Sequence, residues 1–245
     1  MTLDFLSLLA ADAEAFAAAI ETGPAAAEIA GCPGWTVSEL GTHLGFIHRW
    51  ARAAILSGAM PQLDPASDPS PDDLVGIAGW VRDGAARLLT TLHELDPQQP
   101  TWHPFAIEPK VAGLWRRRQA QEASVHRWDA QRAIGLAPTI EAEYATDGVD
   151  EYWTVILPRV ISRQKLAVPT SVFAVETTDT EQRWVVDGGG GTVSLGPEGA
   201  AASARLRGDA ESVLLMLWGR PVPDGVVEVS GDRAVADAWL ALGGA

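Results

Sequence analysis

The chain has 245 residues, of which 47% are hydrophobic, and its 32 acidic against 18 basic residues give a formal net charge of −14. This acidity excludes a general binder of nucleic acid or of anionic membranes, because both partners are themselves polyanions. The single cysteine, Cys32, cannot form an internal disulfide, which favours a reducing compartment, the cytoplasm. The sequence contains no apolar run of about 18 residues that would span a membrane, and its N-terminus lacks the basic start of a secretory signal.

Amphipathic helices separated by turns are predicted for the first 135 residues. Apolar side chains recur at helical spacing in four segments, residues 3–22, 37–57, 71–95 and 111–134. Residues typical of N-caps precede the first three segments: Thr2, Thr36 and Ser70. Thr36 and Glu39 have the spacing of a capping box, and Gly135 is placed to end the fourth helix. Four long helices with one longer loop pack most economically as a four-helix bundle.

A different pattern begins after Pro138. Asp147 is expected to cap one more helix, and short β-branched or alternating runs between Gly- and Pro-rich turns predict strands. These runs are residues 171–177, 183–187, 192–195, 202–207 and 226–230. Asp209 and Asp232 are placed to cap two further helices.

Together these patterns predict a two-domain α+β fold. A four-helix bundle is expected over residues 1–150 and a small α+β domain over residues 151–245. The boundary is expected to fall inside residues 136–165, where the helical pattern gives way to strands.

Histidine and acidic residues are the candidate metal ligands. Glu122 and His126 lie four positions apart on the fourth predicted helix, so both side chains leave the same face. A polar row passes through this pair: Trp115, Gln119, Glu122, His126, Asp129 and Ala133. A third ligand has to come from another helix. His43 borders the inward face of the second helix, and His48, about 140° further round, cannot point to the same place. His103, in a Trp-His-Pro loop, is an outside candidate.

Each of these residues also has a purely structural interpretation. Glu122 and His126 could form a solvent-facing i, i+4 pair, and His43 could be a hydrogen-bonded core histidine. Spacing alone leaves these alternatives open. Cys32, ahead of Pro33 in a loop, has no helix N-terminus to activate it and is expected to be a buried small residue.

Two segments of the chain carry a family signature. The first segment runs from Cys32-Pro-Gly-Trp-Thr through His43. The second runs from Trp115 through Asp129 and contains Glu122 and His126. Both resemble the mycothiol-dependent maleylpyruvate isomerase family. The resemblance implies a DinB-like metal-binding four-helix bundle followed by a small sterol-carrier-like α+β domain. It also implies that His43, Glu122 and His126 bind a divalent metal, usually zinc.

The resemblance further implies a reaction. The metal would hold the small-molecule thiol mycothiol as a thiolate, which would attack an electrophilic substrate in a cis–trans isomerisation or an S-transfer. An arginine of the second domain would anchor a substrate carboxylate, with Arg220 the first candidate and Arg207 the second. An ordinary helix-end role for Arg220 is the alternative. The expected partners are these small molecules, with no nucleic acid and no membrane, and the protein is expected to be a monomer or weak homo-oligomer.

Two other classes of function remain open. One is a non-catalytic metal-binding or hydrophobic-ligand-binding protein, because a fold does not by itself determine activity. The other is hydrolysis by a metal-bound water.

Overall fold

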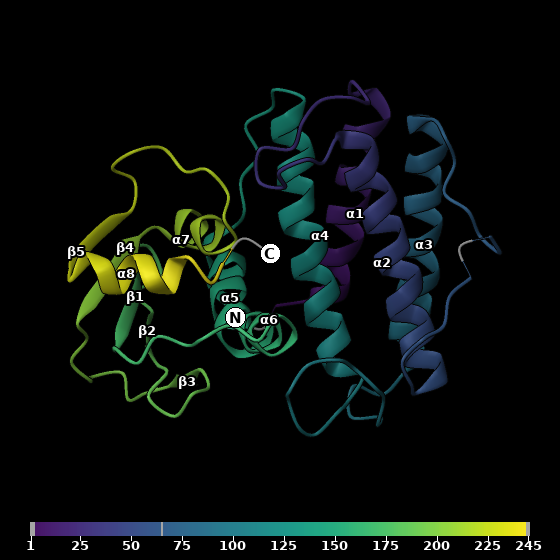
Figure 1. Ribbon diagram of the computed structural model, residues 1–245. Helices are drawn as coiled ribbons and strands as arrows, with labels where there is room; N and C mark the ends of the chain where they lie inside the picture. Colours follow the sequence, from purple (N-terminus) through teal and green to yellow (C-terminus); the bar gives the residue numbers. More distant parts are fainter. Residues whose placement is uncertain (1–2, 65, 244–245) are drawn as a thin grey trace. The chain divides into compact units, whose positions relative to one another are not determined.

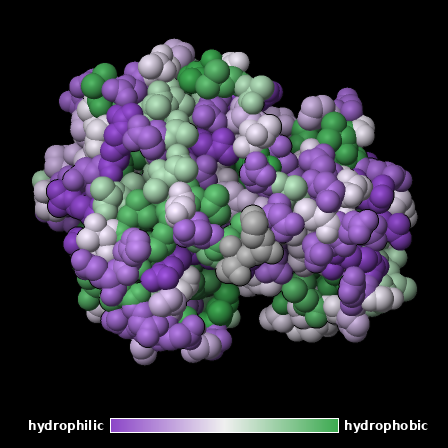
Figure 2. All heavy atoms as spheres, turned by 180° about the vertical axis from the view of Figure 1, so that it is seen from behind, coloured by the Kyte–Doolittle hydropathy of each residue, from purple (hydrophilic) through white to green (hydrophobic). Residues whose placement is uncertain are grey.

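The computed structural model describes residues 3–64 and 66–243, and it consists of two compact units, Met1–Pro138 and Thr139–Ala245 (Figure 1). The division lies ahead of the boundary that the sequence places after residue 150, because helix α5 (Ala142–Glu151) packs inside the second unit. Within the described ranges, no helix combines the length and apolar character needed to cross a bilayer. The face seen in Figure 2 mixes hydrophilic with apolar side chains.

The first unit is the expected four-helix bundle. Its helices are α1 (Phe5–Thr22), α2 (Val37–Ser57), α3 (Leu74–Glu94) and α4 (Gly113–Ala133). Helices α1 and α2 each pack against both α3 and α4. The apolar stripes of the four helices meet in a core in which large side chains are almost fully buried: Phe16, Ile20, Leu40, Leu44, Ile77 and Val81.

The start of α2 follows the sequence signal. Thr36 accepts a hydrogen bond from the backbone N–H of Glu39 at 3.4 Å, and the Glu39 carboxylate accepts one from the backbone N–H of Thr36 at 2.7 Å. This reciprocal pair is the predicted capping box. Gly58 ends the helix in the left-handed region with φ 63°.

Helix α3 starts later than expected. Its N-cap is Asp73, whose carboxylate accepts a hydrogen bond of 2.8 Å from the backbone N–H of Gly76. The predicted cap was Ser70, and that prediction is wrong, because the Ser70 hydroxyl instead lies 3.1 Å from the hydroxyl of Thr42 on α2. The side chain expected to cap α3 thus joins the preceding loop to another helix.

Two other helix starts differ from the prediction. Thr2 lies outside the described residues, and the N-cap of α1 is Asp4, which accepts from the backbone N–H groups of Leu6 and Ser7. Asp147 does not cap a helix but lies inside α5, because the buried face already includes Tyr144 upstream. From α5 the chain continues through a π-helical turn, η1 (Tyr152–Ile156), into α6 (Leu157–Gln164).

The second unit is built on a five-stranded sheet of order β3-β2-β1-β4-β5. Strands β1 and β4 pair in parallel and the other neighbours are antiparallel. The strands are β1 (Phe173–Thr177), β2 (Arg183–Asp187), β3 (Ser194–Leu195), β4 (Ala204–Gly208) and β5 (Glu228–Gly231). All five lie in the runs that predict strands, apart from differences of one or two residues at their ends.

Helices α7 (Ala210–Leu217) and α8 (Arg233–Leu240) pack against this sheet, and Asp209 and Asp232 cap them as predicted. The core of the unit includes a buried aromatic cluster. The rings of Phe173 and Trp239 are stacked with centroids 6.5 Å apart, and Trp153 contacts both edge-on. The second unit is therefore a mixed α+β domain with a core of its own.

Candidate metal centre

Helices α2 and α4 bring the three predicted ligands together. Oε1 of Glu122 lies 3.2 Å from Nε2 of His43 and 3.3 Å from Nε2 of His126. Two ligand atoms bound tetrahedrally to zinc at about 2.0–2.1 Å are separated by about 3.3 Å. Both separations fit a single divalent ion, and among the residues that the structure describes these three form one of two groups that could hold a metal.

The centre is open to solution on the side of His43. The side chain of His43 is 27% exposed, against 14% for Glu122 and 7% for His126. The rings of the two histidines meet edge-on with centroids 5.2 Å apart, and the Trp35 ring packs on His43 at 4.8 Å. The Pro-Gly-Trp segment therefore supplies a wall of the centre, while His48 is fully buried elsewhere on α2.

Glu122 is anionic in this environment. Burial alone would raise its pKa, but the guanidinium of Arg118 and hydrogen bonds from both histidines together hold the pKa of Glu122 well below its usual range. Nη2 of Arg118 donates to Oε2 of Glu122 at 2.6 Å. A deprotonated carboxylate is the form that binds a metal ion.

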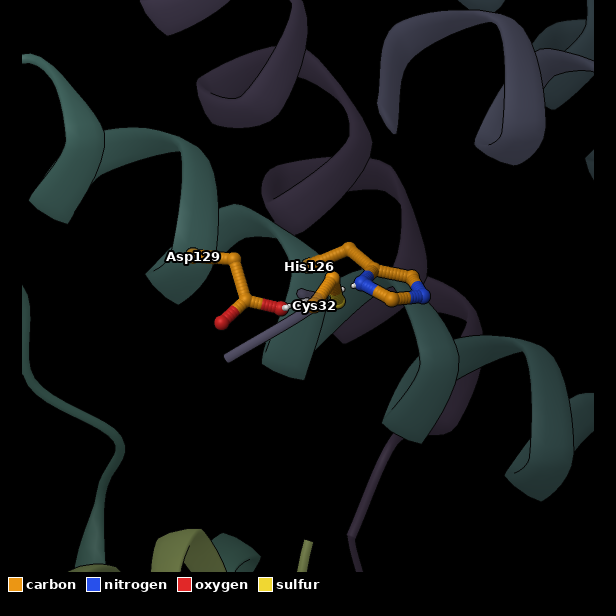
Figure 3. Close-up of side chains that lie close together, drawn as sticks. All are labelled: Cys32, His126 and Asp129. Atoms are coloured by element: carbon orange, nitrogen blue, oxygen red, sulfur yellow. Dashed lines mark hydrogen bonds and ion pairs between the residues drawn. The ribbon is translucent and has the colours of Figure 1, made fainter. Parts of the chain in front are cut away.

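Asp129 is a further residue of the candidate centre, and the sequence pattern did not single it out as a ligand or partner (Figure 3). Its Oδ2 lies 3.2 Å from Nδ1 of His126 and 4.0 Å from Sγ of Cys32. With Nδ1 donating to Asp129, Nε2 is the nitrogen of His126 that would bind a metal in place of its present contact with Glu122, the common carboxylate–histidine–metal arrangement. Burial opposes the charged imidazolium, yet the hydrogen bonds to Asp129 and Glu122 raise the pKa of His126. The sequence signal that could have identified this pair is the i, i+3 spacing of His126 and Asp129 within the polar row of α4.

Cys32 lies beside this centre. It is half-buried rather than buried, and with His126 and Asp129 it makes up the second group whose donor atoms all lie within 4.8 Å of one another. Both groups share His126. In the second group, Nδ1 of His126 and Oδ2 of Asp129 already face each other at 3.2 Å.

The two arginines considered as substrate anchors, Arg220 and Arg207, have local partners. Arg220 follows α7 and is 4% exposed, and its Nη1 donates to the backbone carbonyl of Trp218 at 2.7 Å. This contact is the one expected if Arg220 interacts only with carbonyl groups at the end of α7. Arg207 on β4 lies 3.9 Å from the carboxylate of Glu176. His103 is buried in the loop before α4 and is in neither of the two donor groups.

Both domains of the chain match known protein families. The family profile "Mycothiol maleylpyruvate isomerase N-terminal domain" matches residues 6–131, and the profile "MDMPI C-terminal domain" matches residues 143–238. Among curated proteins, none matches the sequence.

Two solved structures share the fold. A crystal structure of the mycothiol-dependent maleylpyruvate isomerase superposes with a TM-score of 0.61 at 14% identity. A histidine-to-alanine mutant of that enzyme superposes with a TM-score of 0.64 at 13% identity. Each comparison covers 94% of this chain and 93% of the other. With both of its domains matched, the chain belongs to the mycothiol-dependent maleylpyruvate isomerase family of enzymes.

Proposed function

We propose that this protein uses a divalent metal, zinc being the first candidate, to activate mycothiol for attack on a small electrophilic substrate. The observation that supports this most is the position of Oε1 of Glu122, 3.2 Å from Nε2 of His43 and 3.3 Å from Nε2 of His126. Three protein ligands leave a fourth position open, as in catalytic rather than structural zinc sites. When bound, the ion lowers the pKa of a coordinating thiol and so favours the thiolate at neutral pH.

The protein's own side chains orient the candidate ligands and determine their protonation. Asp129 holds His126 in the tautomer that presents Nε2. Arg118 keeps Glu122 ionised. The partial exposure of His43 leaves a route by which a thiol and a substrate can enter from solution. Each of these roles is assigned from contacts within the four-helix bundle.

The reaction we propose is addition of the thiol to an activated carbon–carbon double bond. Loss of the thiol after rotation about the resulting single bond gives cis–trans isomerisation, and its retention gives S-transfer. A carboxylate substrate is favoured by the local charge, because residues 111–132 carry five basic and two acidic side chains in an otherwise acidic chain. Arg220 stays the first candidate for the anchor of that carboxylate, because a guanidinium can hold a carboxylate with two hydrogen bonds, and its contact with the backbone carbonyl of Trp218 supports the helix-end role instead. The single cysteine supports a reducing compartment, the cytoplasm, for this thiol chemistry.

Metal analysis of variants tests the site. His43→Ala, Glu122→Ala and His126→Ala are each expected to purify with much less zinc than the parent protein, because each removes one of three ligands. His93→Ala, at an exposed position on α3, is the matched control and is expected to keep its zinc. Full zinc retention by folded variants of all three ligand positions would overturn the site.

Turnover distinguishes the proposed reactions. The zinc-loaded protein is incubated with mycothiol and maleylpyruvate, and free thiol and the substrate isomers are followed together. Isomerisation converts substrate with no net loss of thiol, whereas S-transfer consumes one thiol for each substrate. If neither occurs with a range of electrophiles while an apolar ligand binds tightly, the enzyme proposal fails and a non-catalytic ligand-binding role is favoured.

A further inference from the structure

Glu122 uses its two carboxylate oxygens for different partners. Oε1 faces Nε2 of His43 at 3.2 Å and Nε2 of His126 at 3.3 Å. Oε2 accepts a hydrogen bond of 2.6 Å from Nη2 of Arg118, which lies one turn earlier on the same helix. The side chain of Arg118 is 4% exposed and that of Glu122 is 14% exposed. Only Oε1 is therefore directed at the two histidines.

We propose that Arg118 is a positioning residue that makes Glu122 a one-oxygen metal ligand. This inference rests on the proposed function, because it requires a metal ion between His43, Glu122 and His126. To chelate the ion with both oxygens, Glu122 would have to withdraw Oε2 from Arg118. That movement breaks a charge-assisted hydrogen bond and separates a buried ion pair, which is costly.

One-oxygen ligation has two consequences for the chemistry. Three donor atoms, one from each ligand, leave a tetrahedral ion with one open position for the thiol. The guanidinium of Arg118 also offsets the negative charge of Glu122, so that the centre stays positive enough to favour a thiolate over a neutral thiol. Arg118 would thus control both the number of ligands and the charge that an incoming thiol meets.

Cobalt substitution tests the coordination directly. The protein is loaded with Co²⁺, whose visible absorption is intense in four-coordinate sites and several-fold weaker in five- or six-coordinate sites. The parent protein is expected to show the intense spectrum. Arg118→Met is expected to lose several-fold in intensity as Oε2 becomes free to join the metal. Arg118→Lys, which keeps a cationic donor, is expected to restore most of it.

Arg127→Met is the matched control. Arg127 is on the same helix and forms a part-buried ion pair of 2.7 Å with Asp12 on α1, so its loss costs stability. It belongs to neither group of candidate metal ligands. Its cobalt spectrum is expected to equal that of the parent. Circular dichroism confirms that each variant is folded, and Arg118→Gln replaces Arg118→Met if the latter does not fold.

The two proposals fail in different ways. An intense four-coordinate spectrum in a folded neutral variant of Arg118 would overturn the role of Arg118 and leave the metal site standing. Failure of the parent protein to bind cobalt would instead overturn the proposed function itself. Equal losses of intensity in Arg127→Met and Arg118→Met would also overturn the inference, because they would indicate a general loosening of α4.

Discussion

Asp129 decides which nitrogen of His126 faces the other donors. Its carboxylate lies 3.2 Å from Nδ1 of His126 (Figure 3). The ring therefore presents Nε2, which lies 3.3 Å from Oε1 of Glu122. Partners of this kind raise the basicity of a ligating histidine and fix the orientation of its ring. We therefore expect Asp129→Asn to weaken zinc binding by about 10- to 100-fold, measured by competition with a chromophoric chelator.

The control for this substitution is Asp12→Asn. Asp12 forms an ion pair of 2.7 Å with Arg127 of α4, and neither residue belongs to a group of candidate metal ligands. It is expected to lower the stability of the bundle while leaving zinc affinity within a few-fold of the parent. An Asp129→Asn protein that binds zinc as tightly as the parent would contradict the orienting role of Asp129.

At the scale of the element, the capping box of α2 determines where the helix begins and hence where His43 lies along it. Thr36 and Glu39 satisfy each other's backbone N–H groups. Replacement of an N-cap threonine by alanine costs roughly 0.5–2 kcal/mol, so Thr36→Ala is expected to lower the free energy of unfolding by about 1 kcal/mol in urea titrations. The control is Thr22→Ala at the C-terminal end of α1. It removes only a hydroxyl that donates to backbone carbonyls of its own turn, and it is expected to change the free energy of unfolding less than Thr36→Ala does.

Elements whose boundaries depend on neighbours in sequence were predictable. The capping box at Thr36 and the caps Asp209 and Asp232 are satisfied within three residues, and they are confirmed. The start of α3 was not, because the hydroxyl of Ser70 bonds to Thr42 on a different helix. A helix boundary predicted from neighbouring residues is wrong where the capping side chain hydrogen-bonds to a residue distant in sequence instead.

The same distinction applies to the candidate site. The four-residue spacing of Glu122 and His126 places both on one face of α4 from the sequence alone. Sequence spacing alone could not distinguish a metal ligand from a hydrogen-bonded core histidine at His43. The packing of α2 on α4 brings its Nε2 to 3.2 Å from Glu122. The separate uses of the two Glu122 oxygens, toward the histidines and toward Arg118, depend on side-chain positions that no spacing specifies.

At the scale of the whole molecule, the stability of the fold is expected to depend on pH through one buried histidine. His48 is fully buried in the bundle, and burial lowers its pKa to about 4, although the charge of Glu122 acts in the opposite direction. In the unfolded chain the pKa of histidine is about 6.5. Between these values the unfolded state binds the proton more strongly, so stability falls as the pH drops from neutrality toward 4.

This difference in pKa amounts to about 2 kcal/mol of stability lost between pH 7 and pH 5. His48→Gln, which has no titrating ring, is expected to reduce the acid-induced loss by a similar amount. The measurement is urea unfolding at both pH values in the presence of a chelator, so that protonation of the metal ligands does not enter through metal release. His93→Gln, on the exposed surface of α3, is expected to keep the parent's dependence on pH. If His48→Gln loses as much stability as the parent between the two pH values, then protonation of the buried ring does not limit the acid stability of the bundle.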